Sequence, residues 1–165
     1  SSDLRATKSR LAYDRLHKRP SMREYNATSA NFNGPTTLIA ESEHWCVLVR
    51  PKQDTLGSLV LVAKSDASAF SKLPPPAFAE METVISDIEA TLSAIFQHDK
   101  INYLMLMMVD PHVHFHVIPR YAEARTLDKW TLADEGWPGQ PNLGSGSSDE
   151  ALVTLMIDTL KAAWG

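Results

Sequence analysis

The sequence predicts an α+β domain in which a five-stranded antiparallel sheet carries one long helix, with a second helix near the C-terminus. Three observations indicate this fold: several short β-branched segments separated by polar turns, one long amphipathic segment, and a stretch in which histidine alternates with apolar residues. The chain has 165 residues, 44% of them hydrophobic, which is enough to bury the core of one domain.

Three strands are expected in the first half of this domain. The segments TTLIA (36–40) and WCVLVR (45–50) are separated by the polar ESEH and predict a β-hairpin. The third strand, SLVLVAK (58–64), follows the loop PKQDTLG. All three segments are rich in residues that favour strands.

One long amphipathic helix is expected from Ala77 to about Gln97, directly after three consecutive prolines at 74–76. Apolar residues recur there at steps of three and four, as they do on one face of a helix. These residues are Phe78, Met81, Ile85, Ile88, Leu92 and Ile95.

Two more strands and a last helix complete the prediction. The segments INYLMLMMV (101–109) and HVHFHVI (112–118) are separated only by Asp110 and Pro111, so we expect them to pair antiparallel across a tight turn. After a loop rich in Pro, Gly and Ser, Ser147 and Glu150 match a capping box. A final amphipathic helix is therefore expected, extending to Trp164.

The domain organisation predicted from these elements is simple. Residues 1–35 form an N-terminal arm, irregular apart from one short helix around 9–18. Residues 36–121 form the core, and residues 122–165 add a loop and the C-terminal helix to the same domain. In that last part, the aromatic residues of WTLADEGW (130–137) either line a base pocket, support a partner subunit or pack locally.

Composition excludes several classes of function. A net charge of −4 argues against binding of bulk nucleic acid, which depends on neutralising phosphates. The only cysteine, Cys46, lies in the apolar WCVLV, so neither an intrachain disulfide nor a zinc site with several thiolates is expected. No run of about 18 apolar residues occurs, and the first residues lack the apolar core of a secretory signal. We therefore expect a cytoplasmic protein that does not insert into a membrane.

The stretch DPHVHFHVIPRY (110–121) carries half of the six histidines of the chain. In a strand, alternate side chains point to opposite faces, so His112, His114 and His116 are expected to share one face. Val113, Phe115 and Val117 then face the long helix. Imidazoles about 6 to 7 Å apart on one strand can supply a nucleophilic nitrogen, donate protons or bind a metal near neutral pH.

HVHFHVI resembles the His-x-His-x-His signature of the histidine-triad (HIT) superfamily, and the following PR and the upstream LGSLVLV are placed as in that family. The resemblance covers residues 36–121. It implies a HIT-like fold, usually dimeric, and hydrolysis or nucleotidyl transfer at the α-phosphate of a dinucleoside polyphosphate or nucleoside phosphoramidate. It implies a nucleotide substrate, an activity like that of a diadenosine polyphosphate hydrolase, and no metal or other cofactor in the covalent step.

The resemblance also implies a role for each histidine. His114 is expected to be the nucleophile that forms a nucleotidyl-histidine intermediate, with its other ring nitrogen oriented by a backbone carbonyl near His112. His112 and His116 are expected to donate hydrogen bonds to the phosphate oxygens or to the leaving group.

Other residues are weaker candidates. Arg50, Ser58 and Asp110 are candidates for binding substrate: Arg50 ends the second strand, and Asp110 directly precedes the histidines. Arg120 is expected to bond backbone or a carboxylate near the sheet edge, and Asn102 to cap its strand.

The sequence departs from the family at two positions. Gly57-Ser58 stands where the family commonly has Gly-His, so a fourth histidine is absent, and Ser58 can replace only a hydrogen bond. The Gly-rich loop before the triad is replaced by Asp110 and Pro111. Two alternatives therefore stay open: a nucleotide-binding module without turnover, and a metalloprotein with His44 or Asp110 as a further ligand.

Overall fold

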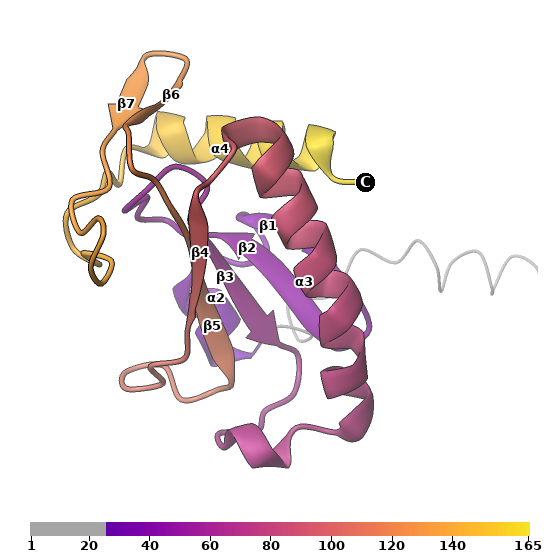
Figure 1. Ribbon diagram of the computed structural model, residues 1–165. Coiled ribbons are helices and arrows are strands. Elements are labelled where there is room, and N and C mark those ends of the chain that lie inside the picture. Colours follow the sequence, from indigo (N-terminus) through magenta and orange to yellow (C-terminus); the bar gives the residue numbers. More distant parts are fainter. Residues whose placement is uncertain (1–25) are drawn as a thin grey trace, which may run out of the picture.

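The computed structural model describes residues 26–165 (Figure 1). The short helix predicted around 9–18 lies outside the described residues. A five-stranded sheet with a long helix on one face and a C-terminal helix forms the body of the domain, which confirms the predicted fold class.

The sheet has the strand order β1-β2-β3-β5-β4, and every neighbouring pair is antiparallel. Strands β2 and β3 are completely buried, as their unbroken runs of Val and Leu predict. The bounds of the strands are β1 Leu38–Glu41, β2 Trp45–Val49, β3 Leu59–Ala63, β4 Lys100–Leu104 and β5 His114–Arg120.

Helix α3, Pro75–Phe96, crosses one face of the sheet (Figure 1). Of the six apolar residues predicted for its buried side, Ile88 and Leu92 are buried, Met81, Ile85 and Ile95 are partly buried against the core, and Phe78 is 40% exposed. The helix begins at a proline because the first turn of a helix does not need that backbone N–H. The indole Nε1 of Trp45 donates to the Ala77 carbonyl over 2.8 Å and ties β2 to the first turn of α3. Helix α4, Glu150–Ala163, packs against β1, β2 and α3 and closes the same core.

The start of α4 corrects the predicted capping box. Asp149 is the N-cap, and its carboxylate accepts a hydrogen bond from the Ala151 N–H over 2.9 Å. Ser147 lies two residues earlier, where its hydroxyl accepts from the Asp149 N–H over 3.3 Å. The box is wrong because Asp149, which also fits an N-cap, is closer to the first helical residue.

The connection between β4 and β5 corrects a second prediction. The two strands pair antiparallel as expected, from Lys100 opposite Arg120 to Leu104 opposite His116. However, β4 ends at Leu104, and residues 105–113 form a loop instead of a tight turn. The apolar Met108 and Val109 at the tip of this loop are 87% and 90% exposed, so their hydrophobicity does not place them in the sheet.

Four short elements were not predicted. Helix α2, Ala27–Asn31, lies within the segment expected to be irregular, on the side of the sheet opposite α3 (Figure 1). A 3-10 turn, Phe70–Lys72, precedes α3. A small hairpin of β6, Arg125–Leu127, and β7, Trp130–Leu132, stands at one end of the sheet (Figure 1). Within residues 26–165, no helix combines the length and apolar character needed to cross a membrane.

Candidate functional site

The histidine face of β5 is defined by its pairing with β3. His114 lies opposite Val62 and His116 opposite Val60, so both imidazoles share the face of these two valines, while Val113 and Val117 join the core under α3. The ring centroids of His114 and His116 are 5.2 Å apart, with the planes at 79°. The alternation predicted from the sequence is confirmed for these two histidines.

His112 lies just before β5 and is positioned by contacts with Thr28 of α2. The Thr28 hydroxyl accepts from the His112 backbone N–H over 3.3 Å and lies 3.1 Å from Nδ1 of the ring. A hydroxyl can either donate to or accept from Nδ1, so this contact positions the ring without fixing its tautomer. Nε2 of the same ring is 3.9 Å from a carboxylate oxygen of Asp66.

The hydrogen bond of His114 does fix a tautomer. Its Nδ1 lies 2.7 Å from the carbonyl oxygen of His112. A carbonyl can only accept, so Nδ1 carries the proton. In the neutral ring, the lone pair is then on Nε2, which is the state that a nucleophilic imidazole requires.

His116 has the opposite tautomer. Nε of Arg50 donates to its Nδ1 over 3.3 Å, so the neutral ring carries its proton on Nε2. The pKa of His116 is lowered to about 4, first by burial and then by the charges of Arg50 and His114, against an opposing effect of Asp110. Near neutral pH, His116 is therefore an uncharged hydrogen-bond donor.

These two histidines are buried under the segment that carries α2. His114 is 2% exposed and His116 is 8% exposed. The ring of Phe32 lies 5.8 Å from the His114 ring and 5.6 Å from the His116 ring, centroid to centroid. A ligand that reaches Nε2 of His114 must therefore approach beside or beneath Phe32.

The three residues predicted to bind substrate differ in their placement. Arg50 contacts His116 directly and forms an ion pair with Asp54. Asp110 accepts from the side-chain amide of Asn31 over 2.6 Å, which joins the 105–113 loop to α2. Ser58 is completely buried, and its hydroxyl donates to the Thr55 carbonyl over 2.7 Å.

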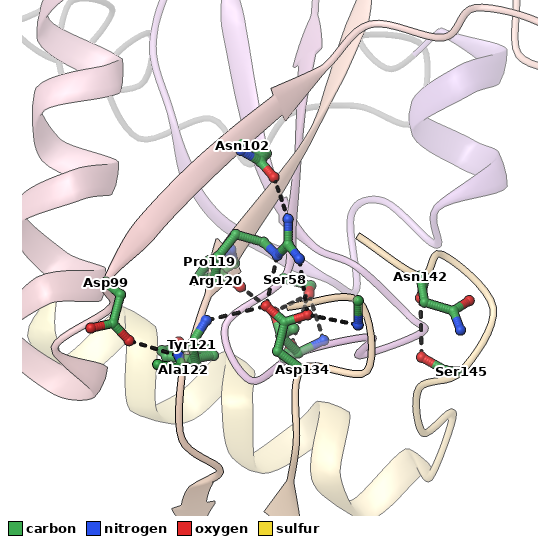
Figure 2. A network of polar contacts seen from close by, with 12 residues as sticks. Ser58, Asp99, Asn102, Pro119, Arg120, Tyr121, Ala122, Asp134, Asn142 and Ser145 are labelled. Atoms are coloured by element: carbon green, nitrogen blue, oxygen red, sulfur yellow. Dashed lines mark hydrogen bonds and ion pairs between the residues drawn. The ribbon is translucent and has the colours of Figure 1, made fainter. Parts of the chain in front are cut away.

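Arg120 lies at the far end of β5 and has the structural role expected for it. Figure 2 shows its guanidinium between Asn102 and Asp134. Its Nε and a terminal nitrogen donate to the two oxygens of Asp134 over 2.7 and 3.1 Å, and its other terminal nitrogen donates to Asn102 over 2.8 Å. The side-chain oxygen of Asn102 thus accepts a hydrogen bond from Arg120 and does not cap its own strand.

Three residues around the site were missed from the sequence: Thr28 and Phe32, which contact the histidines, and Asp54, which contacts Arg50. Thr28 and Phe32 lie in a polar segment with no periodic pattern, and the N-cap residue Asn26 was the only indication of a helix there. Asp54 lies in a loop, where a single carboxylate has many ordinary explanations.

A metal site finds no support in this part of the chain. Within residues 26–165, no group of three or more His, Cys, Asp or Glu side chains is arranged to hold a metal ion. His44, the further ligand considered from the sequence, lies 3.9 Å from a carboxylate oxygen of Glu80 on α3.

Comparison with known families gives one match that covers more than half of the chain. The family model of the HIT domain matches residues 31–123, which include His112, His114 and His116. No curated protein matches the chain by sequence.

Solved structures with the same fold include several histidine-triad proteins. A hypothetical histidine triad nucleotide-binding protein from Sulfolobus tokodaii is 14% identical, with a TM-score of 0.62 over 82% of this chain and 88% of that one. A histidine triad protein from Bradyrhizobium japonicum is 25% identical, with a TM-score of 0.56 over 78% and 90%. A zinc-bound histidine triad family protein from Mycobacterium smegmatis is 22% identical, with a TM-score of 0.54 over 82% and 89%.

Proposed function

This chain belongs to the HIT family, and on that premise we propose that it is a nucleotide hydrolase or nucleotidyl transferase. The substrate is a dinucleoside polyphosphate or a nucleoside phosphoramidate, attacked at its α-phosphate. The observation that carries this proposal is the bond between Nδ1 of His114 and the His112 carbonyl, because it leaves the lone pair of the middle imidazole on Nε2.

In the proposed first step, Nε2 of His114 forms a bond to the α-phosphorus, and the bond from phosphorus to the leaving group breaks. The electron pair of that bond leaves with the leaving group, which takes up a proton from the solvent. In the second step, the oxygen of water or of another hydroxyl acceptor attacks the phosphorus and releases its proton to the solvent, and the N–P bond returns its electrons to His114. A neutral nucleophile suits a phosphate that already carries negative charge.

The flanking histidines supply hydrogen bonds in this mechanism. His116 presents Nε2–H to a non-bridging phosphate oxygen and stays neutral near pH 7, because its pKa lies near 4. His112 serves the leaving group from the other side. Fixed donors aimed at developing charge typically contribute roughly 100- to 1000-fold in rate each.

Arg50 and Asp110 are the substrate contacts that we retain. Arg50 brings a positive charge to the edge of the site and suits a phosphate or ribose oxygen. Asp110 fixes the loop before the triad through Asn31 and accepts hydrogen bonds from a ribose. Ser58 acts through the turn around Thr55, because its hydroxyl is already engaged there.

The proposal is tested by incubating the protein with a diadenosine polyphosphate or with adenosine phosphoramidate and analysing the products. We expect His114→Ala to abolish turnover, and His112→Ala and His116→Ala to leave a remainder reduced roughly 100- to 1000-fold. His44→Ala is the matched control, since it removes an imidazole that contacts Glu80. An acid-labile phosphohistidine should be trapped on the wild type. A folded His114→Ala protein with wild-type turnover would refute the mechanism.

A nucleotide-binding module without turnover is the second candidate. It is favoured by Ser58, which replaces a histidine and turns its hydroxyl to Thr55, and by the burial of His114 under Phe32. Calorimetric titration with AMP separates the two candidates: tight binding with no turnover of any nucleotide tested supports the module.

We further propose that the protein is a homodimer in the cytoplasm. Apolar side chains that are at least 40% exposed support an interface; they are Phe70, Phe78, Leu106, Met108 and Val109. Light scattering at micromolar concentration should give twice the mass of one chain. The mass of one chain would contradict this proposal, and imaging of a fluorescent fusion tests the location.

A further inference from the structure

Asp54 is a buried carboxylate that touches none of the histidines. Its residue is 3% exposed, and it lies in the loop between β2 and β3. One of its oxygens forms an ion pair with a terminal nitrogen of Arg50, and the other accepts from the Gly146 backbone N–H over 3.2 Å. Asp54 thus joins the arginine at the histidine site to the segment before α4.

That C-terminal segment is held tightly against the loop. Gln53 and Ser147 exchange two backbone hydrogen bonds, of 2.9 and 3.0 Å. A Cβ atom on Gly146 would lie 2.0 Å from the Gln53 carbonyl oxygen and 2.4 Å from Cα of Asp54. Only glycine allows this approach, so the position of Asp54 depends on residue 146.

The guanidinium of Arg50 is fixed on two sides. Its terminal nitrogen also donates to the Lys52 carbonyl over 3.1 Å, and its Nε donates to Nδ1 of His116 over 3.3 Å. A long, flexible side chain keeps one direction only when its donors are occupied in this way. Without Asp54, the guanidinium keeps a single carbonyl and a neutral imidazole as acceptors.

We propose that Asp54 is a positioning residue which, held by the backbone of Gly146 and Ser147, keeps Arg50 against His116 and thereby keeps the proton of His116 on Nε2. The C-terminal segment then determines which nitrogen of a site histidine can donate. The consequence for catalysis rests on the proposed function, because a His116 ring with its proton on Nδ1 would present a lone pair to a phosphate oxygen. The effect on the tautomer does not depend on turnover.

The test uses the full chain and nitrogen-15 NMR of the histidine rings, with Asp54→Asn and Gly146→Ala as variants. Gly144→Ala is the matched control, since a Cβ there meets nothing closer than 3.8 Å. In the wild type, we expect Nδ1 of His116 to give the signal of an unprotonated nitrogen. In both variants, the signals should shift toward a mixture of tautomers, while Gly144→Ala should leave them unchanged.

A pH titration followed in the same spectra shows whether the pKa of His116 rises or falls in the variants. The charged groups that affect His116 are Arg50, His114 and Asp110, and the uncharged ring of Phe32 packs beside it. If Arg50 moves away, one cause of the lowered pKa of His116 is removed and the pKa rises. If Arg50 stays and only loses the neutralising carboxylate, the pKa falls.

A falling or unchanged pKa in folded Asp54→Asn would overturn the proposal, and so would a protonated Nδ1 of His116 in the wild type. The wild-type measurement applies even if neither variant folds. Where turnover is found, kcat/KM of Asp54→Asn should fall, but by less than the roughly 100- to 1000-fold expected for loss of the His116 donor. A tautomer shift in a protein without turnover would uphold this inference and count against the proposed enzyme.

Discussion

Lowering the pH should destabilise this protein through His116. In the folded state the pKa of His116 is lowered to about 4, chiefly by burial, whereas in the unfolded chain a histidine titrates near its ordinary value of about 6.5. Between these two values the unfolded chain binds a proton that the folded protein does not. The contribution is therefore fully present above about pH 6.5 and is lost as the pH falls toward 4.

The magnitude follows from the two pKa values. A pH of 5 is about 1.5 units below the pKa of the imidazole in the unfolded chain, which is therefore almost fully protonated. In the folded protein the imidazole is still mostly neutral at this pH. At about 1.4 kcal/mol per unit, this difference costs about 2 kcal/mol of unfolding free energy relative to neutral pH. For a chain of this length, that corresponds to a melting temperature lower by roughly 4 to 8 °C.

The assay compares the wild type with His116→Asn by thermal and urea unfolding at pH 7.5 and pH 5. Asparagine keeps an oxygen acceptor for Arg50 near the position of Nδ1 but does not titrate. All other groups titrate in both proteins, so the wild type should lose about 2 kcal/mol more than the variant between the two pH values. Equal losses would refute the conclusion that His116 is buried in its neutral form.

Two further predictions concern residues outside the triad, and a third concerns metal removal. Asp134→Ala leaves the buried Arg120 guanidinium without its carboxylate and should cost about 3 to 5 kcal/mol in urea unfolding, whereas Asp99→Ala, in a more exposed pair 3.8 Å from Arg125, should cost less than about 1 kcal/mol. Similar losses from both variants would contradict this comparison. Gly57→Ala should lower the free energy of unfolding by roughly 2 to 5 kcal/mol, because Gly57 has φ of +89° and a Cβ would lie 2.9 Å from a methyl carbon of a core leucine. A melting temperature like that of the wild type would contradict this prediction. Prolonged dialysis against a chelator should leave any turnover unchanged, since a cation on His114 would occupy the lone pair that the mechanism needs; loss of turnover that zinc restores would support the metalloprotein alternative.

Periodicity predicted the elements that face the core and failed for those that do not. The steps of three and four in α3 and the apolar runs of β2 and β3 reflect burial, and all three elements form near their predicted bounds. The run LMLMMV after Tyr103 is as apolar as a strand, yet Met108 and Val109 are almost fully exposed. Composition alone cannot distinguish an apolar loop from a buried strand.

The candidate site was predictable only as far as it lies on one strand. Alternation places His114 and His116 on a common face because the pleat of a strand has a fixed period. The partners that fix the rings come from elsewhere: Thr28 reaches His112 across 84 positions and Arg50 reaches His116 across 66. Such contacts depend on the tertiary fold and leave no local pattern in the sequence.

The position of β5 inside the sheet has a consequence for how a substrate can enter. Its backbone is hydrogen-bonded on one side to β3 and on the other to β4, so its amides should be among the slowest in the molecule to exchange with deuterium. Helix α2 has only five residues and is held mainly by side-chain contacts, so its amides should exchange much faster. Local opening that exposes His114 should therefore be a movement of the covering segment around Phe32, while the strand that carries the histidines keeps its hydrogen bonds to β3 and β4.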